Sequence, residues 1–420
     1  MRIMVFGTGG AGGYFGAQLA RAGEDVVFVA RGEHLRAIRA SGLRVETSSD
    51  EILISPAQAT DDPAEVAGVG VVLVGVKAWQ VAEAARTMQP AVGPESFVVP
   101  LQNGVDAASE LAAVLGPEHV LAGLCGTFSW VIAPGRIRSV GAANFIKFAE
   151  LDNRPSDRAV QLREAFRKAG VVVEIPSDVH KALWEKFLTV TAVGGVGAVT
   201  RAAIGATRAM PETRRLLEQC MQEAFAVARS REVALADTIV AETMTFIDSL
   251  AADGTTSLQR DIVDGKPSEL EYWNGAVVRA ETRRGDHRRA ACGTIDDFVR
   301  SASERNRKFV DSPLEGDGFE LPVPRVMQAR LKAKIIAKFG MPPSIICGCR
   351  RWPSAQAQSE KSRNQTQIAR GTGSSNPSAS SGESVANSIL AKAALPMRAG
   401  SSHQSLSDQR LRACECRSAS

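Results

Sequence analysis

A run of glycines follows the first apolar stretch of the chain. The sequence reads RIMVFGTGGAGGYF, and Gly7, Gly9 and Gly12 match the pattern G-x-G-x-x-G. Between a strand pattern and a helix pattern, such a loop lets the backbone turn tightly, approach a pyrophosphate and pack helix on strand. The helix start then offers free N–H groups to the phosphates. A glycine turn that serves only packing is the alternative. The predicted pyrophosphate-binding residues are Gly7, Thr8, Gly9, Gly10, Ala11 and Gly12.

The end of the second apolar stretch indicates which dinucleotide binds. Enzymes that use NAD usually place an acidic residue there, which accepts hydrogen bonds from the ribose 2′-hydroxyl. In this chain DVVFVAR ends in Arg31 instead. A guanidinium can pair with a 2′-phosphate, whereas a carboxylate would repel it. Arg31 therefore favours NADP (NADPH), while the nearby Glu33 leaves NAD open and a solvated surface arginine remains the alternative.

Two more polar residues follow later strand patterns. Lys77 comes just after VGVVLVGV, and Asn103 and Gly104 come after SFVVPLQ. The carboxyl ends of parallel strands share one edge of the sheet, and ligands bind at that edge. Either residue alone could end a strand in a turn. Together they predict a cleft in which Lys77 and Asn103 contact the cofactor.

The elements that must position these residues alternate between strand and helix. The apolar runs RIMVF, DVVFVA, VGVVLVGV, SFVVPL and VVVEI predict buried strands, and residues 14–22 and 81–88 have helical patterns between them. This alternation predicts an α/β fold, a Rossmann-type doubly wound parallel sheet, over residues 1–175. Pro176, Ser177 and Asp178 then indicate a domain boundary and a helix start.

From residue 180 to about 280 the pattern changes to long amphipathic helices. LLEQCMQEAFAVARSREV and ADTIVAETMTFIDSL repeat apolar residues at three- and four-residue spacing. We therefore predict an all-helical C-terminal domain, over residues 176–305, that carries the substrate and catalytic groups.

Composition excludes several classes of protein. The 420 residues suit two domains and an appendage. A net charge of +4 gives no reason to expect a nucleic-acid partner. No apolar stretch is expected to reach the roughly 18–20 residues that span a membrane, and no secretion signal is evident. The isolated Cys125, Cys220 and Cys292 suit a reduced compartment. We expect a cytoplasmic protein and no metal site.

The motifs, taken in order, resemble one family. GTGGAGG, VKAWQV, LQNGV, ALWEKF, and SLQRD followed by ELEYWNG resemble 2-dehydropantoate 2-reductase (ketopantoate reductase) over roughly residues 1–280. The resemblance implies an NADP-binding α/β domain joined to a helical domain, with the active site in the cleft between them.

The resemblance also implies roles for individual residues. Lys186 in ALWEKF matches the catalytic lysine, which also binds substrate, and Ser257 matches a substrate-binding serine. Glu269 matches a glutamate near cofactor and substrate, Asn103 faces both, and Asp261 is interpreted as structural support. Hydride transfer to a 2-keto acid places negative charge on the ketone oxygen, which a cation stabilises and can protonate. The implied catalytic residues are Lys186, Asn103 and Glu269, and the implied cofactor contacts include Lys77, Asn103 and Glu269.

The chain departs from the family pattern in the substrate region. Val190, Gly194 and Ile204 stand where the family has asparagines. Their loss predicts weakened or redirected recognition of ketopantoate, while the cofactor and lysine chemistry remain.

The last part of the chain resembles nothing in the family. Residues 351–420 hold 16 serines in 70 positions, a composition that predicts disorder. We interpret residues 306–420 as disordered or as an artefact of gene prediction, through a frameshift or a lost stop codon. A genuine regulatory extension is the alternative.

The sequence therefore predicts an NADPH-dependent reductase of a 2-keto acid, with 2-dehydropantoate as the leading substrate and (R)-pantoate as product. The alternatives are reduction of a different small 2-keto acid, and an NADP(H)-sensing protein without turnover. A small molecule is the expected partner, and a homodimer is left open.

Overall fold

Alternate side chains of the first strand face opposite sides of a parallel sheet. In the computed structural model, which describes residues 1–282, β1 (Arg2–Phe6) sends Ile3 and Val5 into one apolar core and Met4 and Phe6 into another. Both faces of this strand are therefore covered, as in a sheet with elements packed on either side.

The first sheet has five strands, all paired in parallel, and confirms the predicted Rossmann-type fold. Its order is β5 (Gln58–Thr60), β2 (Asp25–Val29), β1, β6 (Val71–Val74) and β7 (Phe97–Pro100). Because β1 lies in the middle, the glycine loop that follows it opens at the centre of the carboxyl edge, where chain connections diverge to the two sides.

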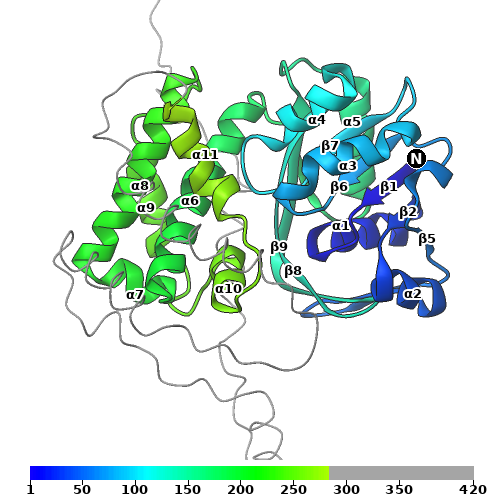
Figure 1. Cartoon of the computed structure of the whole chain (residues 1–420), viewed down its shortest axis with the longest axis horizontal. Helices are drawn as coiled ribbons and strands as arrows, with labels where there is room; N and C mark the ends of the chain where they lie inside the picture. The colour runs from blue at the N-terminus through cyan, green and yellow to red at the C-terminus, as the bar shows by residue number, and fades with distance from the viewer. Residues whose placement is uncertain (283–420) are drawn as a thin grey trace, which may run out of the picture.

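Helices and a second sheet cover the two faces. The face that carries Ile3 packs against α1 (Gly10–Arg21), and α5 (Asp157–Lys168) joins the same core through α1 and the second sheet. The opposite face packs against α3 (Val81–Met88) and α4 (Ala107–Leu115). α2 (Gly32–Ser41) follows β2 at the edge of this part (Figure 1).

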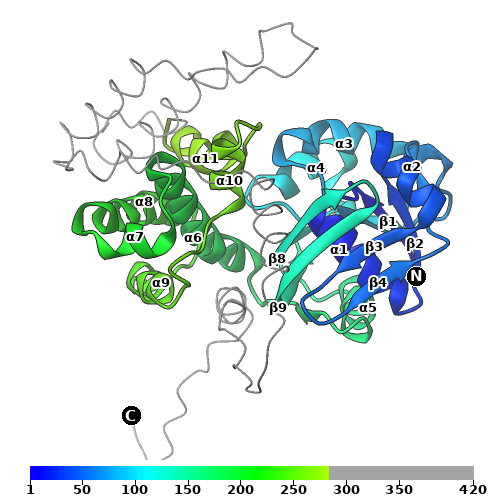
Figure 2. The ribbon, with the colours of Figure 1, turned by 90° about the horizontal axis from the view of Figure 1, so that it is seen from below.

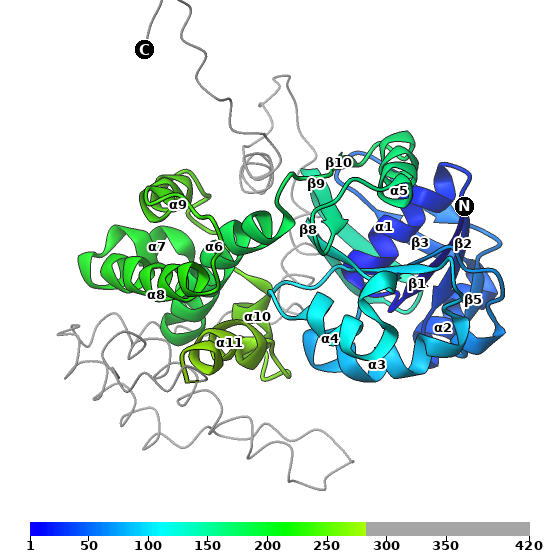
Figure 3. The same ribbon diagram turned by 90° about the horizontal axis from the view of Figure 1, so that it is seen from above.

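The second sheet was not predicted from the sequence. It runs in the order β10 (Val172–Glu174), β9 (Arg136–Glu150), β3 (Leu43–Glu46) and β4 (Glu51–Ile54), and β8 (Leu121–Ala133) pairs with β9. The strand predicted from VVVEI is present as β10, but it belongs to this sheet, so its assignment to the first sheet was wrong. The long β8–β9 hairpin stands between α1 and the helical part in two further views (Figures 2 and 3).

The first helix of the helical part begins at the helix start that Asp178 predicts. Asp178 caps α6 (Val179–Thr200) by accepting a hydrogen bond from the Lys181 N–H at 2.9 Å. The helices that follow are α7 (Ile204–Ala209), α8 (Pro211–Ser230), α9 (Ile239–Asp248), α10 (Ser257–Val263) and α11 (Leu270–Thr282). Their apolar faces form one core around α6 and α8.

α6 corrects one expectation. By length and composition it is apolar enough to cross a membrane, so the expectation that no stretch reaches that length was wrong. However, 67% of its apolar window is buried inside the fold. The helix is apolar nearly all round because other helices surround it.

Several predictions fall outside the described residues. These are residues 283–305 of the predicted second domain and all of the predicted tail at 306–420.

Candidate active site

The glycine loop brings three backbone segments into close contact. Gly7 has φ +99°, and a Cβ there would lie 2.8 Å from the Val76 nitrogen. A Cβ on Gly12 would lie 2.3 Å from the Gly7 oxygen, and one on Gly75 would lie 2.9 Å from the Gly12 Cα. By contrast, the nearest atom to a Cβ on Gly9 is 3.9 Å away. The first and third glycines are therefore needed for packing, and the second leaves open space beside the loop.

Hydrogen bonds fix the loop against its neighbours. The Thr8 N–H and hydroxyl both donate to the Val29 oxygen, at 3.1 and 2.9 Å. His34 Nδ1 accepts from the Gly135 N–H at 3.0 Å, so Nε2 carries the proton and donates to the Thr8 oxygen at 2.8 Å. Burial lowers the pKa of His34, which favours this neutral form. His34 thus ties the loop to α2 and to the β8–β9 turn, a link that the sequence did not indicate.

Arg31 lies beside this loop. It is the exposed N-cap residue of α2 and follows the buried end of β2, whose Val29 oxygen accepts from Gly7 and Thr8. Within residues 1–282 no hydrogen bond or ion pair engages its guanidinium. The group is accessible at the edge of the sheet where a ribose phosphate was predicted to lie.

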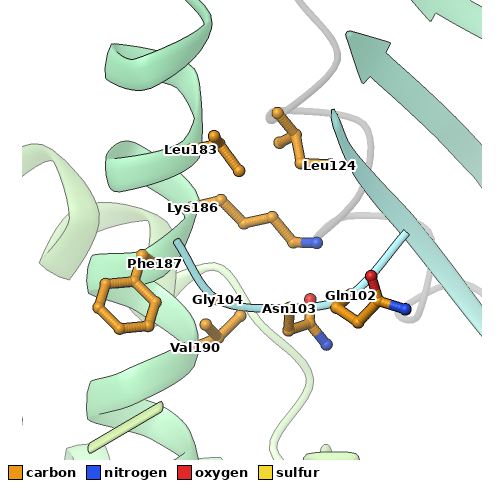
Figure 4. A pocket seen from close by; sticks show the side chains of 8 residues that line it. All are labelled: Gln102, Asn103, Gly104, Leu124, Leu183, Lys186, Phe187 and Val190. Carbon is orange, nitrogen blue, oxygen red and sulfur yellow. The ribbon is translucent and has the colours of Figure 1, made fainter. Parts of the chain in front are cut away.

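A pocket brings Lys186 and Asn103 together from the two parts of the chain (Figure 4). Lys186 projects from α6 and donates from Nζ to the Cys125 oxygen of β8. Burial lowers the pKa of Lys186, and the negative charge of Glu269 acts in the opposite direction. The lining residues are Gln102, Asn103, Gly104, Leu124, Leu183, Lys186, Phe187 and Val190.

Gln102 is a pocket residue that the sequence analysis missed. Its side chain is 6% exposed, and Nε2 donates to the Val74 and Val76 oxygens at 2.9 and 2.8 Å. These two bonds fix the amide orientation, and Oε1 is buried with no hydrogen-bond partner within residues 1–282. A buried acceptor of this kind requires a donor, which a ligand can supply. Its place in LQNGV, directly before Asn103, was the available signal.

Lys77, Asp261 and Glu269 form a charged bridge between the two parts. The Lys77 ammonium lies 3.0 Å from Asp261 Oδ2 and 3.7 Å from Glu269 Oε2. Glu269 Oε1 also accepts from the Ala78 N–H at 3.0 Å. Burial raises the pKa of Glu269, while Lys77 and the Ala78 N–H lower it. The predicted cofactor lysine therefore joins the helical part to the sheet edge.

The remaining predicted positions do not line this pocket. Ser257 begins α10, after the Thr256 cap, and is partly buried. Ile204 is buried in the helical core, and a Cβ on Gly194 would lie 3.0 Å from Leu258 and 3.1 Å from the Trp273 ring. Among the three positions where amides were expected, Val190 is the one that lines the pocket.

Comparison with known proteins decides the family. The family model "Ketopantoate reductase PanE/ApbA" matches residues 3–153, and the model for the C-terminal domain of that family matches residues 178–286. The chain belongs to the ketopantoate reductase family.

The matches to this chain cover most of the length of each relative. A 2-dehydropantoate 2-reductase from Nostoc sp. is 29% identical over 274 residues, which is 64% of this chain and 85% of the relative. An uncharacterised oxidoreductase, YkpB, from Bacillus subtilis is 25% identical over 67% of this chain and 93% of its own. A PanE/ApbA family ketopantoate reductase structure from Ralstonia eutropha is 30% identical, with a TM-score of 0.67 over 73% of this chain and 99% of that one. The chain is thus an oxidoreductase of this family, acting on a CH–OH group.

Two matched alanine variants, at Gly12 and Gly9, test the different roles of the loop glycines. Gly12→Ala is expected to lower the melting temperature, because its Cβ would overlap the Gly7 oxygen. Gly9→Ala is expected to leave the melting temperature nearly unchanged but weaken binding of the nicotinamide cofactor at least about tenfold, because its methyl group would occupy the open side of the loop.

Thermal unfolding would measure the melting temperatures, and fluorescence titration of the folded proteins with NADPH would measure cofactor binding. A Gly9→Ala protein that binds NADPH as tightly as the parent chain would contradict the assignment of this loop to the pyrophosphate.

Proposed function

We propose that the protein reduces a 2-keto acid to a 2-hydroxy acid with NADPH. The observation that carries this proposal is the partly buried Lys186 ammonium, which shares a pocket with Asn103 near the carboxyl edge of the Rossmann sheet. A cation placed there can meet a ketone oxygen at the moment when that oxygen becomes negative.

The residues present fit a nicotinamide dinucleotide. Open space beside Gly9 supports a pyrophosphate there, and Gln102, which lines the pocket, has a buried Oε1 with no partner among the described residues. When bound, the cofactor supplies a hydride to the keto carbon. Gly7–Gly12 would hold the pyrophosphate, Arg31 the 2′-phosphate, and Asn103 the ribose next to the nicotinamide.

Lys186 would act as the acid. Its Nζ, held by the Cys125 oxygen, would donate a hydrogen bond to the ketone oxygen and then the proton that completes the alcohol. The lowered pKa makes the ammonium a better proton donor than an exposed lysine. Glu269 would keep the lysine protonated, because its negative charge raises the pKa of Lys186.

2-Dehydropantoate is the reference substrate, because the Nostoc relative is named for it. Its reduction would give (R)-pantoate for pantothenate and coenzyme A synthesis, a cytoplasmic role. A different small 2-keto acid is the alternative, because Val190 and Gly194 supply no polar side chain. Ser257 is retained as a substrate contact that would require α10 to approach the pocket.

Removal of the lysine tests the proposed chemistry. Lys186→Ala is expected to lower kcat by about 10²- to 10⁴-fold, because the acid and the charge on the ketone oxygen are lost together. NADPH oxidation with a panel of 2-keto acids, followed by absorbance, would measure it. Lys181→Ala, on the first turn of the same helix, is the matched control and should retain full activity.

An unchanged rate in Lys186→Ala would remove this residue from the mechanism. A folded parent protein that binds NADPH but oxidises it with none of the acids would support the sensing alternative instead.

The pH profile gives a second prediction. If the ammonium is the acid, kcat/KM should be constant at lower pH and fall as pH rises through a pKa below 10.5, the ordinary value for lysine. Glu269→Gln should move this falling limb to lower pH, because the carboxylate raises the pKa of Lys186. A limb that stays in place in Glu269→Gln would contradict the electrostatic role given to Glu269.

Cofactor choice gives a third prediction. Arg31→Ala is expected to lower kcat/KM for NADPH by about 10- to 100-fold, the usual effect of losing a charged hydrogen bond, and to change kcat/KM for NADH little. Arg39→Ala, on the exposed side of the same helix, is the control. Equal losses with both cofactors would show that Arg31 does not read the 2′-phosphate.

A further inference from the structure

The α6 wall of the pocket is made of hydrocarbon. Leu183, Phe187 and Val190 surround Lys186 on one face of the helix, at the spacing that brings side chains together. Leu124 of β8 also lines the pocket (Figure 4). The part of a substrate that lies beyond its ketone, along this helix, therefore meets apolar side chains.

The buried polar side chains next to this wall, Thr191 of α6 and Asn274 of α11, do not line the pocket. The Thr191 hydroxyl is fully buried and donates to the Phe187 oxygen at 2.6 Å. The Asn274 amide, also fully buried, donates from Nδ2 to the Thr191 oxygen at 3.2 Å, and its Oδ1 has no hydrogen-bond partner among the described residues. The polar lining side chains are Gln102, Asn103 and Lys186, two of which come from the loop after β7.

The next turn of α6, beyond the pocket lining, packs against more apolar surface. A Cβ at Gly194 would meet Leu258 at 3.0 Å and Trp273 Cζ3 at 3.1 Å. Trp273 presents Cζ3 and Cε3 to this position, so its N–H lies on the opposite edge of the indole. The atoms nearest to this position are therefore the carbons of Leu258 and of the Trp273 ring.

We propose that the substrate is a 2-keto acid whose side chain is apolar and carries no hydroxyl group, and that Val190 sets this specificity. The inference rests on the proposed reductase function and narrows its substrate class. A hydroxyl placed against Val190 and Leu183 would lose its hydrogen bonds to water and gain none. An apolar pocket discriminates against an added hydroxyl by at most about 100-fold, so we expect a preference of about 10- to 100-fold.

Two acids that differ by one hydroxyl test the proposal directly. 3,3-Dimethyl-2-oxobutanoate has the carbon skeleton of 2-dehydropantoate without its 4-hydroxyl group. With NADPH and the full chain, kcat/KM for the deoxy acid should exceed that for 2-dehydropantoate by about tenfold or more. A higher kcat/KM for 2-dehydropantoate would overturn the proposal and leave the reductase function standing.

Variants at Val190 supply the second measurement. Val190→Asn should reduce the preference for the deoxy acid at least about tenfold, because it adds an amide to the hydrocarbon wall. Val190→Thr keeps the shape of valine and should shift the ratio in the same direction, which covers the case in which Val190→Asn folds poorly. A ratio that neither variant changes would overturn the role of Val190.

Gln102 offers a competing mode of substrate recognition, because its Oε1 could accept a hydrogen bond from a substrate hydroxyl. Gln102→Met removes the acceptor at similar size. If the parent chain prefers 2-dehydropantoate and Gln102→Met loses that preference, Gln102 recognises the hydroxyl and the proposal is wrong. If the folded protein binds NADPH and reduces neither acid nor any other 2-keto acid, the proposed function itself fails.

Discussion

The rest of this site depends on one partly buried ammonium group, that of Lys186. Removing an ammonium from water is costly unless hydrogen bonds and opposite charge compensate for it. Lys186 has the Cys125 oxygen as its acceptor and the negative charge of Glu269 nearby, while burial lowers its pKa. The helical part must therefore hold α6 against β8, since the lysine and its acceptor lie on different parts of the chain. The charged bridge of Lys77 with Asp261 and Glu269 holds the same two parts together.

The opposite side of the site depends on close backbone packing. Gly7, Gly12 and Gly75 let β1, α1 and the segment after β6 approach more closely than side chains allow. That packing sets the glycine loop at the centre of the sheet edge, and His34 fixes it from α2. The glycine loop and Arg31 therefore lie on one side of the candidate site, and Lys186 lies on the other. Hydride chemistry needs such a division, with the dinucleotide on one wall and the acid on the other.

The sequence predicted the parts of this structure whose signals are local. The apolar runs of β1, β2, β6 and β7, the pattern of α3 and the Asp178 cap of α6 were all readable from neighbouring residues. The β8–β9 hairpin was missed because its mixed glycines, serines and charges hide the alternation, and its pairing with β3 spans about ninety residues. β10 has the pattern of a parallel strand, but nothing in that pattern says which sheet it joins.

In the candidate site, too, the sequence predicted what local signals carry and missed what depends on distant partners. The glycine loop, Arg31, Lys77 and Asn103 followed from their positions after strands, whereas Lys186, Ser257 and Glu269 needed the resemblance to a family. Gln102 and His34 were missed because their importance lies in long-range partners, the Val74 and Val76 oxygens and the Gly135 N–H. Val190 was recognised as a departure, but only the pocket shows that it joins a hydrocarbon wall.

The most direct test of the account is to follow the transferred hydride. NADPH that carries deuterium at the transferable position of its nicotinamide would be incubated with the full chain and a 2-keto acid, and the product analysed by NMR. The account predicts a 2-hydroxy acid with deuterium at carbon 2. An unchanged 2-keto acid, in the presence of folded protein that binds the cofactor, would contradict it.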